Sequence, residues 1–120
     1  ATGRQLWARD LSSLSGVGLD ARYEYVSDEK GAVHALDRSN GRSVWKQDRL
    51  ALRQLSQPLP VGDTVVVGDY QGYVHFLARD SGAFVARYAT DGGAIRAAPV
   101  PLPNGFLVQT QDGSLFALAP

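Results

Sequence analysis

Cysteine is absent from the 120-residue sequence, and so is an excess of charge of either sign. The lack of cysteine excludes disulfide bonds, thiolate catalysis and cysteine-ligated zinc within this chain. Twelve basic and twelve acidic residues cancel, so the chain lacks the electrostatic attraction typical of a nucleic-acid binder or of a protein held on anionic lipid. No apolar run approaches the roughly 20 residues of a membrane-spanning helix, and residues 1–4 do not begin like a signal peptide.

An internal repeat with a step of 41 residues runs through the sequence. Three six-residue segments share a glycine at their start and a leucine at their end, and Pro58 and Pro99 keep the same spacing. A repeat of about 40 residues is typical of solenoids and propellers, in which each unit packs on the next. The three segments are Gly31–Leu36, Gly72–Leu77 and Gly113–Leu118.

Within the repeat, the residues follow the period of strands rather than that of helices. Residues 64–67 form a β-branched run and residues 73–77 alternate moderately in character, which favours short strands. Turn formers that end in glycine separate the runs and permit tight hairpins. We therefore expect four strands in each unit. The expected strands of the two complete units are 15–20, 22–27, 32–37 and 42–47, and then 55–59, 64–69, 73–78 and 83–89.

These features predict an all-β fold, namely a β-propeller fragment of about three four-stranded antiparallel blades. Residues 1–10 are predicted to supply the outer strand of a preceding blade, because Gly3–Trp7 matches Gly41–Trp45. Since propellers typically need four to eight blades to close, we expect a fragment that self-associates or packs on other propeller segments. The further predicted boundaries are 11–50 for one blade, 51–91 for the next, and 92–120 for a final blade with three strands near 95–101, 105–110 and 114–119.

One short segment carries a motif that accounts for the packing of such blades on one another. Ala35, Asp37, Gly41 and Trp45 follow the pattern A-x-D-x-x-x-G-x-x-x-W. This pattern resembles the tryptophan-docking motif of quinoprotein-type propellers. The glycine permits a hairpin, the alanine leaves space for an indole, and the tryptophan packs between neighbouring blades. Trp7 ends a second copy of the motif.

The next copy of the motif is altered, because Phe76 stands in place of the alanine and Ala86 in place of the tryptophan. Two families share this architecture: the pyrroloquinoline-quinone dehydrogenases and the BamB family of outer-membrane assembly lipoproteins. The later part of the chain resembles the final two blades of BamB-like sequences. The residues that carry this resemblance are 65–74, 80–86 and 108–115.

The resemblance to the BamB family implies a role for the chain. The family is an eight-bladed propeller without a cofactor, and it serves as a non-catalytic scaffold subunit of the outer-membrane β-barrel assembly machinery. The implied partners are the periplasmic domains of BamA and, as a second class, unfolded outer-membrane proteins. The implied location is the periplasmic face of the outer membrane, through a lipid-carrying cysteine outside this chain. The alternative is a fragment of a pyrroloquinoline-quinone-dependent dehydrogenase, which would need a catalytic aspartate and calcium ligands.

The segment that links the two complete blades is the candidate for partner binding. Arg49, Leu50, Leu52 and Arg53 bring leucines and arginines into a connection of a kind that normally runs over the surface. Arginine beside exposed apolar residues is a combination that favours protein binding. In the BamB family, inter-blade loops with a comparable leucine–arginine pattern hold BamA. The alternative is that Leu52 and Leu55 anchor the inner strand of the next blade.

The residues with catalytic potential are better explained by structural roles. His34 and His75 occupy the same repeat position, and successive blades fan apart, so the two histidines are not expected to share a metal ion. Asp28 and Asp69 stand before hairpin glycines, where a carboxylate caps a turn. No nucleophile elbow, P-loop or complete dinucleotide-binding motif occurs. We therefore predict no enzyme activity, no catalytic residue, no metal site and no bound cofactor.

Overall fold

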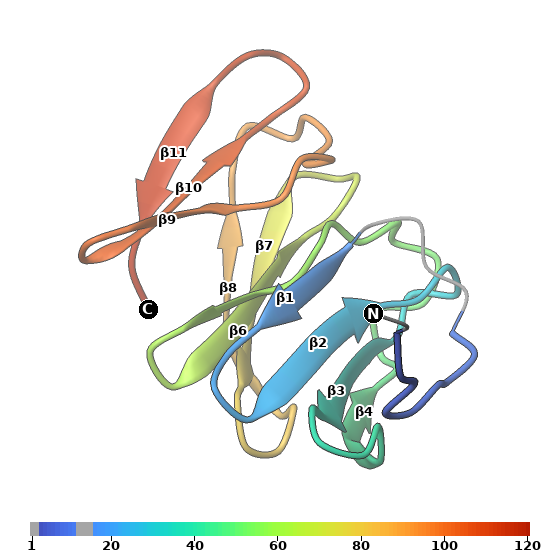
Figure 1. Ribbon diagram of the computed structural model, residues 1–120. Coiled ribbons are helices and arrows are strands. Elements are labelled where there is room, and N and C mark those ends of the chain that lie inside the picture. Colours follow the sequence, from blue (N-terminus) through green and yellow to red (C-terminus); the bar gives the residue numbers. More distant parts are fainter. Residues whose placement is uncertain (1–2, 12–15) are drawn as a thin grey trace.

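Three antiparallel sheets, set one beside the next like the blades of a fan, make up the structure (Figure 1). The computed structural model describes residues 3–11 and 16–120. These residues contain eleven strands and no helix, so the described part of the chain includes no helix that could cross a membrane. The all-β class predicted from the sequence is confirmed.

Each sheet is one blade, and its strands lie side by side in chain order. Blade 1 contains β1 (Val17–Leu19), β2 (Tyr23–Ser27), β3 (Val33–Asp37) and β4 (Ser43–Gln47). Blade 2 contains β5 (Leu59–Val61), β6 (Thr64–Gly68), β7 (Tyr73–Ala78) and β8 (Phe84–Ala89). Blade 3 contains β9 (Val100–Leu102), β10 (Gly105–Gln109) and β11 (Leu115–Leu118).

Residues 1–10 are predicted to supply the outer strand of a preceding blade. Residues 3–10 lie outside the three sheets, and residues 1–2 lie outside the described residues, so this assignment stays a prediction. The inner strands begin later than predicted, at Leu59 in β5 and at Val100 in β9. Pro58 and Pro99 immediately precede these strands, and proline has no N–H group to extend the ladder. The boundaries between the domains stay a prediction.

The middle blade is buried on both faces. Val65, Val66 and Val67 of β6 are all fully buried. Successive side chains of a strand point to opposite faces, so Val65 and Val67 pack with residues of blade 1, whereas Val66 packs with residues of blade 3. The β-branched run therefore serves two interfaces at once.

The hydrophobic core lies between the blades. The contact between blades 1 and 2, here called the first interface, is centred on Tyr25, Trp45 and Leu77. The contact between blades 2 and 3, here called the second interface, is centred on Phe76 and Phe106. Burial of a side chain of this size contributes roughly 1.5–3 kcal/mol, so the packing of one blade on the next stabilises the whole arrangement.

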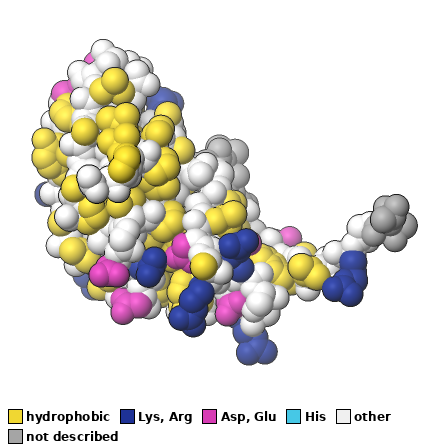
Figure 2. All heavy atoms as spheres, turned by 60° about the vertical axis from the view of Figure 1, so that its left-hand side comes forward, with side chains coloured by type: hydrophobic (Ala, Val, Ile, Leu, Met, Phe, Trp, Pro, Cys, Tyr) yellow, Lys and Arg dark blue, Asp and Glu magenta, His cyan; other side chains and the backbone are white. Residues whose placement is uncertain are grey.

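Blade 3 exposes many apolar side chains. Figure 2 shows hydrophobic side chains gathered over the upper part of the molecule, where blade 3 lies. Val100 is 54% exposed, Leu102 is 38% exposed and Leu115 is 64% exposed. Clusters of exposed apolar residues of this kind mark surfaces that associate with other protein surfaces.

Candidate functional site

Trp45 ties the outer strand of blade 1 to the outer hairpin of blade 2. Its indole Nε1–H donates a hydrogen bond to the carbonyl oxygen of Arg79 at 2.8 Å. Its ring lies against Gly82, where φ is 76°. A methyl group at Gly82 would overlap the indole, so glycine satisfies both the left-handed backbone and the close packing. The Gln47 side-chain amide donates a further hydrogen bond to the Gly82 carbonyl oxygen at 2.8 Å.

Trp7 repeats this arrangement one blade earlier. Its Nε1–H donates a hydrogen bond to the carbonyl oxygen of Arg38 at 2.8 Å, and its ring lies against Gly41, where φ is 74°. Arg9 donates a hydrogen bond to the Gly41 carbonyl oxygen at 3.3 Å. Residues 3–11 thus dock on blade 1 although they form no strand, so this contact does not depend on sheet formation.

The remaining residues of the docking motif shape the hairpin and the space behind it. Ala35 lies opposite Trp45 in the pairing of β3 with β4, and it is fully buried. Asp37 accepts a hydrogen bond from the backbone N–H of Ser39 at 2.8 Å. In the altered copy of the docking motif, the large and small residues change places: Phe76 on β7 lies opposite Ala86 on β8.

Asp69 caps the hairpin between β6 and β7 and also holds His75. Its Oδ1 accepts hydrogen bonds from the backbone N–H groups of Gln71 and Tyr73 at 2.9 and 3.0 Å. Its Oδ2 lies 2.8 Å from His75 Nε2 and 3.2 Å from Arg53 Nη1. Burial alone raises the pKa of this carboxyl group, but the hydrogen bonds from His75 and from the backbone outweigh it, and the pKa is lowered.

Blade 1 contains the same arrangement. Asp28 Oδ1 accepts hydrogen bonds from the backbone N–H groups of Lys30 and Ala32 at 3.0 and 2.9 Å, and its Oδ2 lies 2.8 Å from His34 Nε2. Burial raises the pKa of Asp28, and the hydrogen bonds from His34 and the backbone lower it by more. The predicted turn-capping role is confirmed. No cluster of three or more metal-ligating side chains occurs among residues 3–11 and 16–120.

The linker loop, residues 48–58 between β4 and β5, carries the predicted partner-binding residues. Leu52 is 84% exposed and Arg49 is also exposed, whereas Arg53 is half-buried. The sequence predicts the same surface position for Leu50 as for these three residues, but Leu50 is only 2% exposed and packs in the first interface. The loop therefore presents Leu52 and the arginines to solvent, while Leu50 anchors it from below.

The alternative, that Leu52 and Leu55 anchor the inner strand of blade 2, holds for only one of the two leucines. Leu55 is 8% exposed and belongs to the first interface, so it anchors the chain that leads into β5. Leu52 cannot do so, because its side chain is the most exposed of the large apolar side chains in the described residues.

Two non-glycine residues of the linker loop have left-handed backbones: φ is 65° at Leu52 and 50° at Gln54. Such residues cost on the order of 1 kcal/mol or more, and they persist only where neighbours hold them. The Leu52 N–H donates a hydrogen bond to the Lys30 carbonyl oxygen at 3.4 Å, and the Tyr70 N–H donates one to the Arg53 carbonyl oxygen at 3.0 Å. The hairpins of both blades therefore fix the shape in which the loop displays Leu52.

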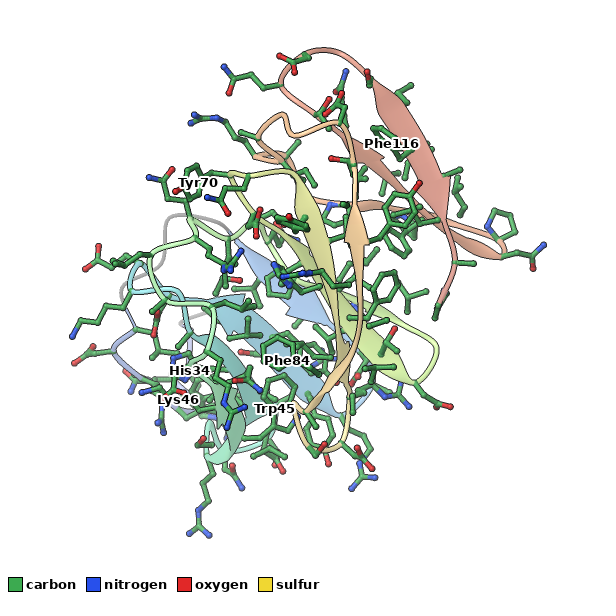
Figure 3. The ribbon with its side chains drawn as sticks, turned by 180° about the vertical axis from the view of Figure 1, so that it is seen from behind. His34, Trp45, Lys46, Tyr70, Phe84 and Phe116 are labelled. Atoms are coloured by element: carbon green, nitrogen blue, oxygen red, sulfur yellow. The ribbon has the colours of Figure 1, made fainter. Side chains whose placement is uncertain are left out.

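A groove of about 340 Å³ lies between the linker loop and strand β8. Apolar side chains of β8 are open to solvent along it, because Phe84 is 42% exposed and Val85 is 59% exposed. Phe84 projects from β8 of blade 2 and Trp45 from β4 of blade 1 (Figure 3). The residues that line the groove are Arg49, Leu50, Arg53, His75, Phe84, Val85, Ala86 and Arg87. It combines three arginines with an apolar floor, a composition that suits protein recognition.

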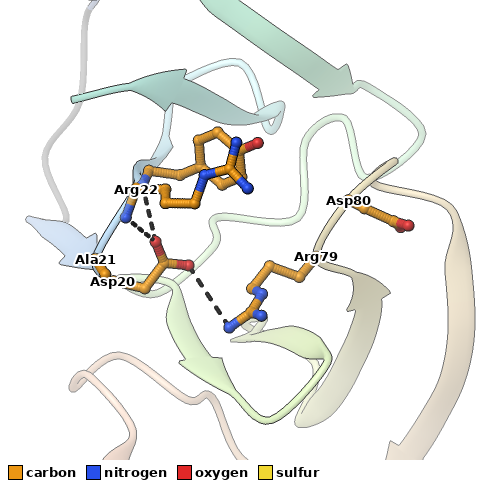
Figure 4. Close-up of a pocket in the computed structure, with 6 residues that line it drawn as sticks. Asp20, Ala21, Arg22, Arg79 and Asp80 are labelled. Atoms are coloured by element: carbon orange, nitrogen blue, oxygen red, sulfur yellow. Dashed lines mark hydrogen bonds and ion pairs between the residues drawn. The ribbon is translucent and has the colours of Figure 1, made fainter. Parts of the chain in front are cut away.

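A second pocket, of about 230 Å³, lies at the other end of blades 1 and 2 (Figure 4). Asp20 accepts hydrogen bonds there from the backbone N–H groups of Arg22 and Tyr23 and from the Tyr25 hydroxyl, and it lies 3.9 Å from Arg79 Nη1. Burial and the hydrogen bond to Asp20 raise the pKa of Tyr25. Both carboxylate oxygens are engaged in structural contacts, so this pocket is explained by hairpin capping.

The sequence missed the part of the groove that β8 supplies. The sequence predicts only that Phe84, Val85 and Arg87 belong to a strand; they are exposed because β8 is the edge strand of its sheet. The altered docking motif is a sequence signal for this exposure. Position 86 is alanine where the motif has tryptophan, so the strand has less apolar surface to bury. That signal did not identify the linker loop as the opposite wall.

Comparison with known proteins gives consistent matches. A family model described as outer membrane protein assembly factor BamB matches residues 1–47. BamB of Burkholderia pseudomallei is 45% identical over 119 residues, which are 99% of this chain and 31% of the relative. BamB of Bordetella pertussis is 46% identical over 115 residues, which are 96% of this chain and 30% of the relative. The chain thus spans less than a third of the length of these relatives.

Solved structures share the fold. The crystal structure of BamB from Moraxella catarrhalis matches with a TM-score of 0.87 at 30% identity, over 94% of this chain and 34% of that one. A quinohemoprotein alcohol dehydrogenase from Pseudomonas putida HK5 matches with a TM-score of 0.69 at 18% identity, over 88% and 18% of the two chains, and this likeness concerns the fold alone. The predicted resemblance is therefore confirmed: along almost its whole length, the chain is similar to one part of the outer membrane protein assembly factor BamB.

Proposed function

We propose that the chain is part of a non-catalytic scaffold subunit of the machinery that assembles outer-membrane β-barrels. Its similarity to BamB over nearly all of its residues supports this role most directly. The same similarity supports a location at the periplasmic face of the outer membrane. The capping contacts of Asp28 and Asp69 further support a scaffold, because they occupy the side chains that carry the greatest catalytic potential.

Within this role, the linker loop is the proposed contact with the periplasmic domains of BamA, and unfolded outer-membrane proteins are a second class of partner. The supporting observation is Leu52, which is 84% exposed on a backbone held in the left-handed region. Strain of this kind is retained where it serves a purpose. Arginine is enriched in the hot spots of protein interfaces, and Leu52 lies between Arg49 and Arg53 in the sequence.

The test is a binding titration between the protein and the periplasmic domains of BamA. The variant Leu52→Asp should weaken binding at least tenfold, because it places a charge where an apolar contact is proposed. The matched control is Leu6→Asp, because Leu6 is 74% exposed and lies outside the linker loop and outside every strand, and this variant should bind like the unaltered protein. Equal affinity of Leu52→Asp and the unaltered protein would remove the linker loop from the interface.

The proposed scaffold should also associate with further propeller surfaces. Val17 and Leu19 on β1 and Val100 and Leu102 on β9 are exposed at inner strands, where adjoining blades of a propeller cover apolar side chains. We expect the 120-residue chain to form concentration-dependent oligomers in light scattering coupled to size exclusion. A monodisperse species of 12.9 kDa at every concentration would contradict this expectation.

A further inference from the structure

We infer that the groove between the linker loop and β8 binds an acidic segment of a partner protein in extended conformation. This inference rests on the proposed function and names the chemistry of the partner at that site. Three properties of the groove carry it: positive charge, an apolar floor, and the unpaired edge of a strand along its length.

The charge of the groove is positive and largely uncompensated. Among the ion pairs of the described residues, none includes Arg49 or Arg87. Arg53 does lie 3.2 Å from Asp69 Oδ2, but Asp69 also holds His75 and is fully buried. The carboxylate of Asp69 is therefore already bound by both His75 and Arg53. The exposed guanidinium groups of Arg49 and Arg87 are available to carboxylates of a partner.

Arg87 is held in a defined position. Its guanidinium lies 4.5 Å from the centroid of the Tyr73 ring, an arrangement that attracts a cation to the face of an aromatic ring. A guanidinium fixed in this way loses less freedom on binding than a mobile one, and its planar donors match a carboxylate. Arg87 is therefore suited to fix the register of an acidic segment along β8.

The floor of the groove is apolar. Phe84 and Val85 are partly exposed, and the Phe84 ring meets His75 edge-on with 6.4 Å between ring centroids. Leu50 closes the floor from beneath, since it is almost fully buried. An acidic segment with an aliphatic or aromatic side chain between its carboxylates would cover this floor while its charges reach the arginines.

The edge of β8 argues for an extended segment. β8 pairs with β7 on one side and is the last strand of its sheet, and all six of its residues are exposed. An edge strand offers backbone N–H and C=O groups to another strand. Alternate side chains of an added strand point to the same face, which would direct every second side chain into the groove.

The test uses a synthetic eight-residue peptide of alternating aspartate and leucine, titrated into the protein by fluorescence anisotropy. We expect binding that weakens with salt, as attraction between exposed charges does. Arg87→Glu and Arg49→Glu should each raise Kd at least tenfold. Lys46→Glu is the matched control, because Lys46 is the repeat counterpart of Arg87 on the exposed face of β4 (Figure 3), and its Kd should not change.

Three results would overturn the inference: equal binding of a peptide with lysine in place of aspartate, unchanged Kd in Arg49→Glu, or unchanged Kd when alternate backbone nitrogens of the acidic peptide are methylated. Arg49→Glu guards against a folding defect in Arg87→Glu, because Arg49 makes no ion pair in the described residues. If BamA domains bind but Arg87→Glu does not affect them, the inference fails and the proposed function stands. If the acidic peptide binds as expected and BamA domains do not bind, the groove stands and the proposed function fails.

Discussion

The two interfaces between blades contain the same kind of contact with the large and small residues exchanged. At the first interface the large residue is Trp45 on the outer strand β4, with Ala35 opposite it on β3. At the second interface the large residue is Phe76 on β7, with Ala86 opposite it on β8. Each pair combines one aromatic and one methyl side chain, but Ala35 is fully buried beside Trp45, whereas Ala86 is exposed beside Phe76.

The exchange moves the aromatic side chain from the rim of the blade toward its middle. Trp45 reaches the outer hairpin of the next blade and donates a hydrogen bond there. Phe76 instead meets Phe106 of blade 3 edge-on, with 5.7 Å between ring centroids. The outer strand β4 is therefore tied to its neighbour by a buried tryptophan, whereas every residue of β8 is exposed. A strand without a docking tryptophan is available to line a groove.

The largest effect is expected for Trp45→Ala, which would break the first interface. Removal of the indole leaves a cavity and also the hydrogen bond to Arg79 unmade, so the free energy of unfolding should fall by about 3–5 kcal/mol. The measurement is urea denaturation followed by circular dichroism. Ala86→Ser, at the equivalent position of β8, is the control and should cost far less. Similar losses in the two variants would show that tryptophan docking adds nothing at the first interface.

Gly82→Ala should follow, with a loss of roughly 3 kcal/mol, because the added methyl group overlaps the Trp45 ring and φ is positive. Gly62→Ala is a matched control. Its φ is 58°, but no atom lies within 4 Å of the added methyl group, so only the backbone cost of about 1 kcal/mol remains. Equal losses in the two variants, compared by urea denaturation, would mean that the tryptophan contact does not constrain Gly82.

The hairpins and the packing of successive blades were predictable because they depend on residues that recur in register. A glycine at position 41 and again at position 82 is needed wherever an indole lies against a left-handed backbone. The same holds for Asp28 and Asp69, whose carboxylates cap the hairpins between the second and third strands of blades 1 and 2. Local chemistry repeated at a fixed step is visible without a structure.

The groove was not predictable in the same way, because its walls are far apart in the chain. Arg53 and Phe84 belong to different elements, and only the fold brings them to one groove. Leu50 and Leu52 were likewise indistinguishable by composition, yet one is buried and the other exposed. Leu52 also has a left-handed φ, and a leucine in sequence gives no sign of that conformation.

A double substitution in blade 2 tests whether a tryptophan can dock at position 86. Phe76→Ala alone should cost about 3–5 kcal/mol, because it leaves a cavity beside Phe106. Adding Ala86→Trp restores the pattern of the first interface and should recover about 1 kcal/mol of that loss, a coupling typical of residues in contact. The measurement is a double-mutant cycle of unfolding free energies. Simple additivity of the two changes would mean that position 86 cannot accept a docking tryptophan.

The smallest effect is expected for the buried hairpin carboxylates at low pH. The folded-state pKa of Asp69 is lowered, so its contribution to stability is complete above the unfolded pKa of about 3.9 and is lost as the pH falls through the folded-state pKa. Asp69→Asn should therefore be less stable than the unaltered protein near pH 7, by about 1 kcal/mol, and the difference should shrink below about pH 4. Asp28→Asn should behave in the same direction with a smaller difference, because the Asp28 side chain is 14% exposed and that of Asp69 is fully buried. A difference for Asp69 that stays constant from pH 7 to pH 3 would mean that its hydrogen bonds do not favour the charged form, and the two hairpins would then differ in packing alone.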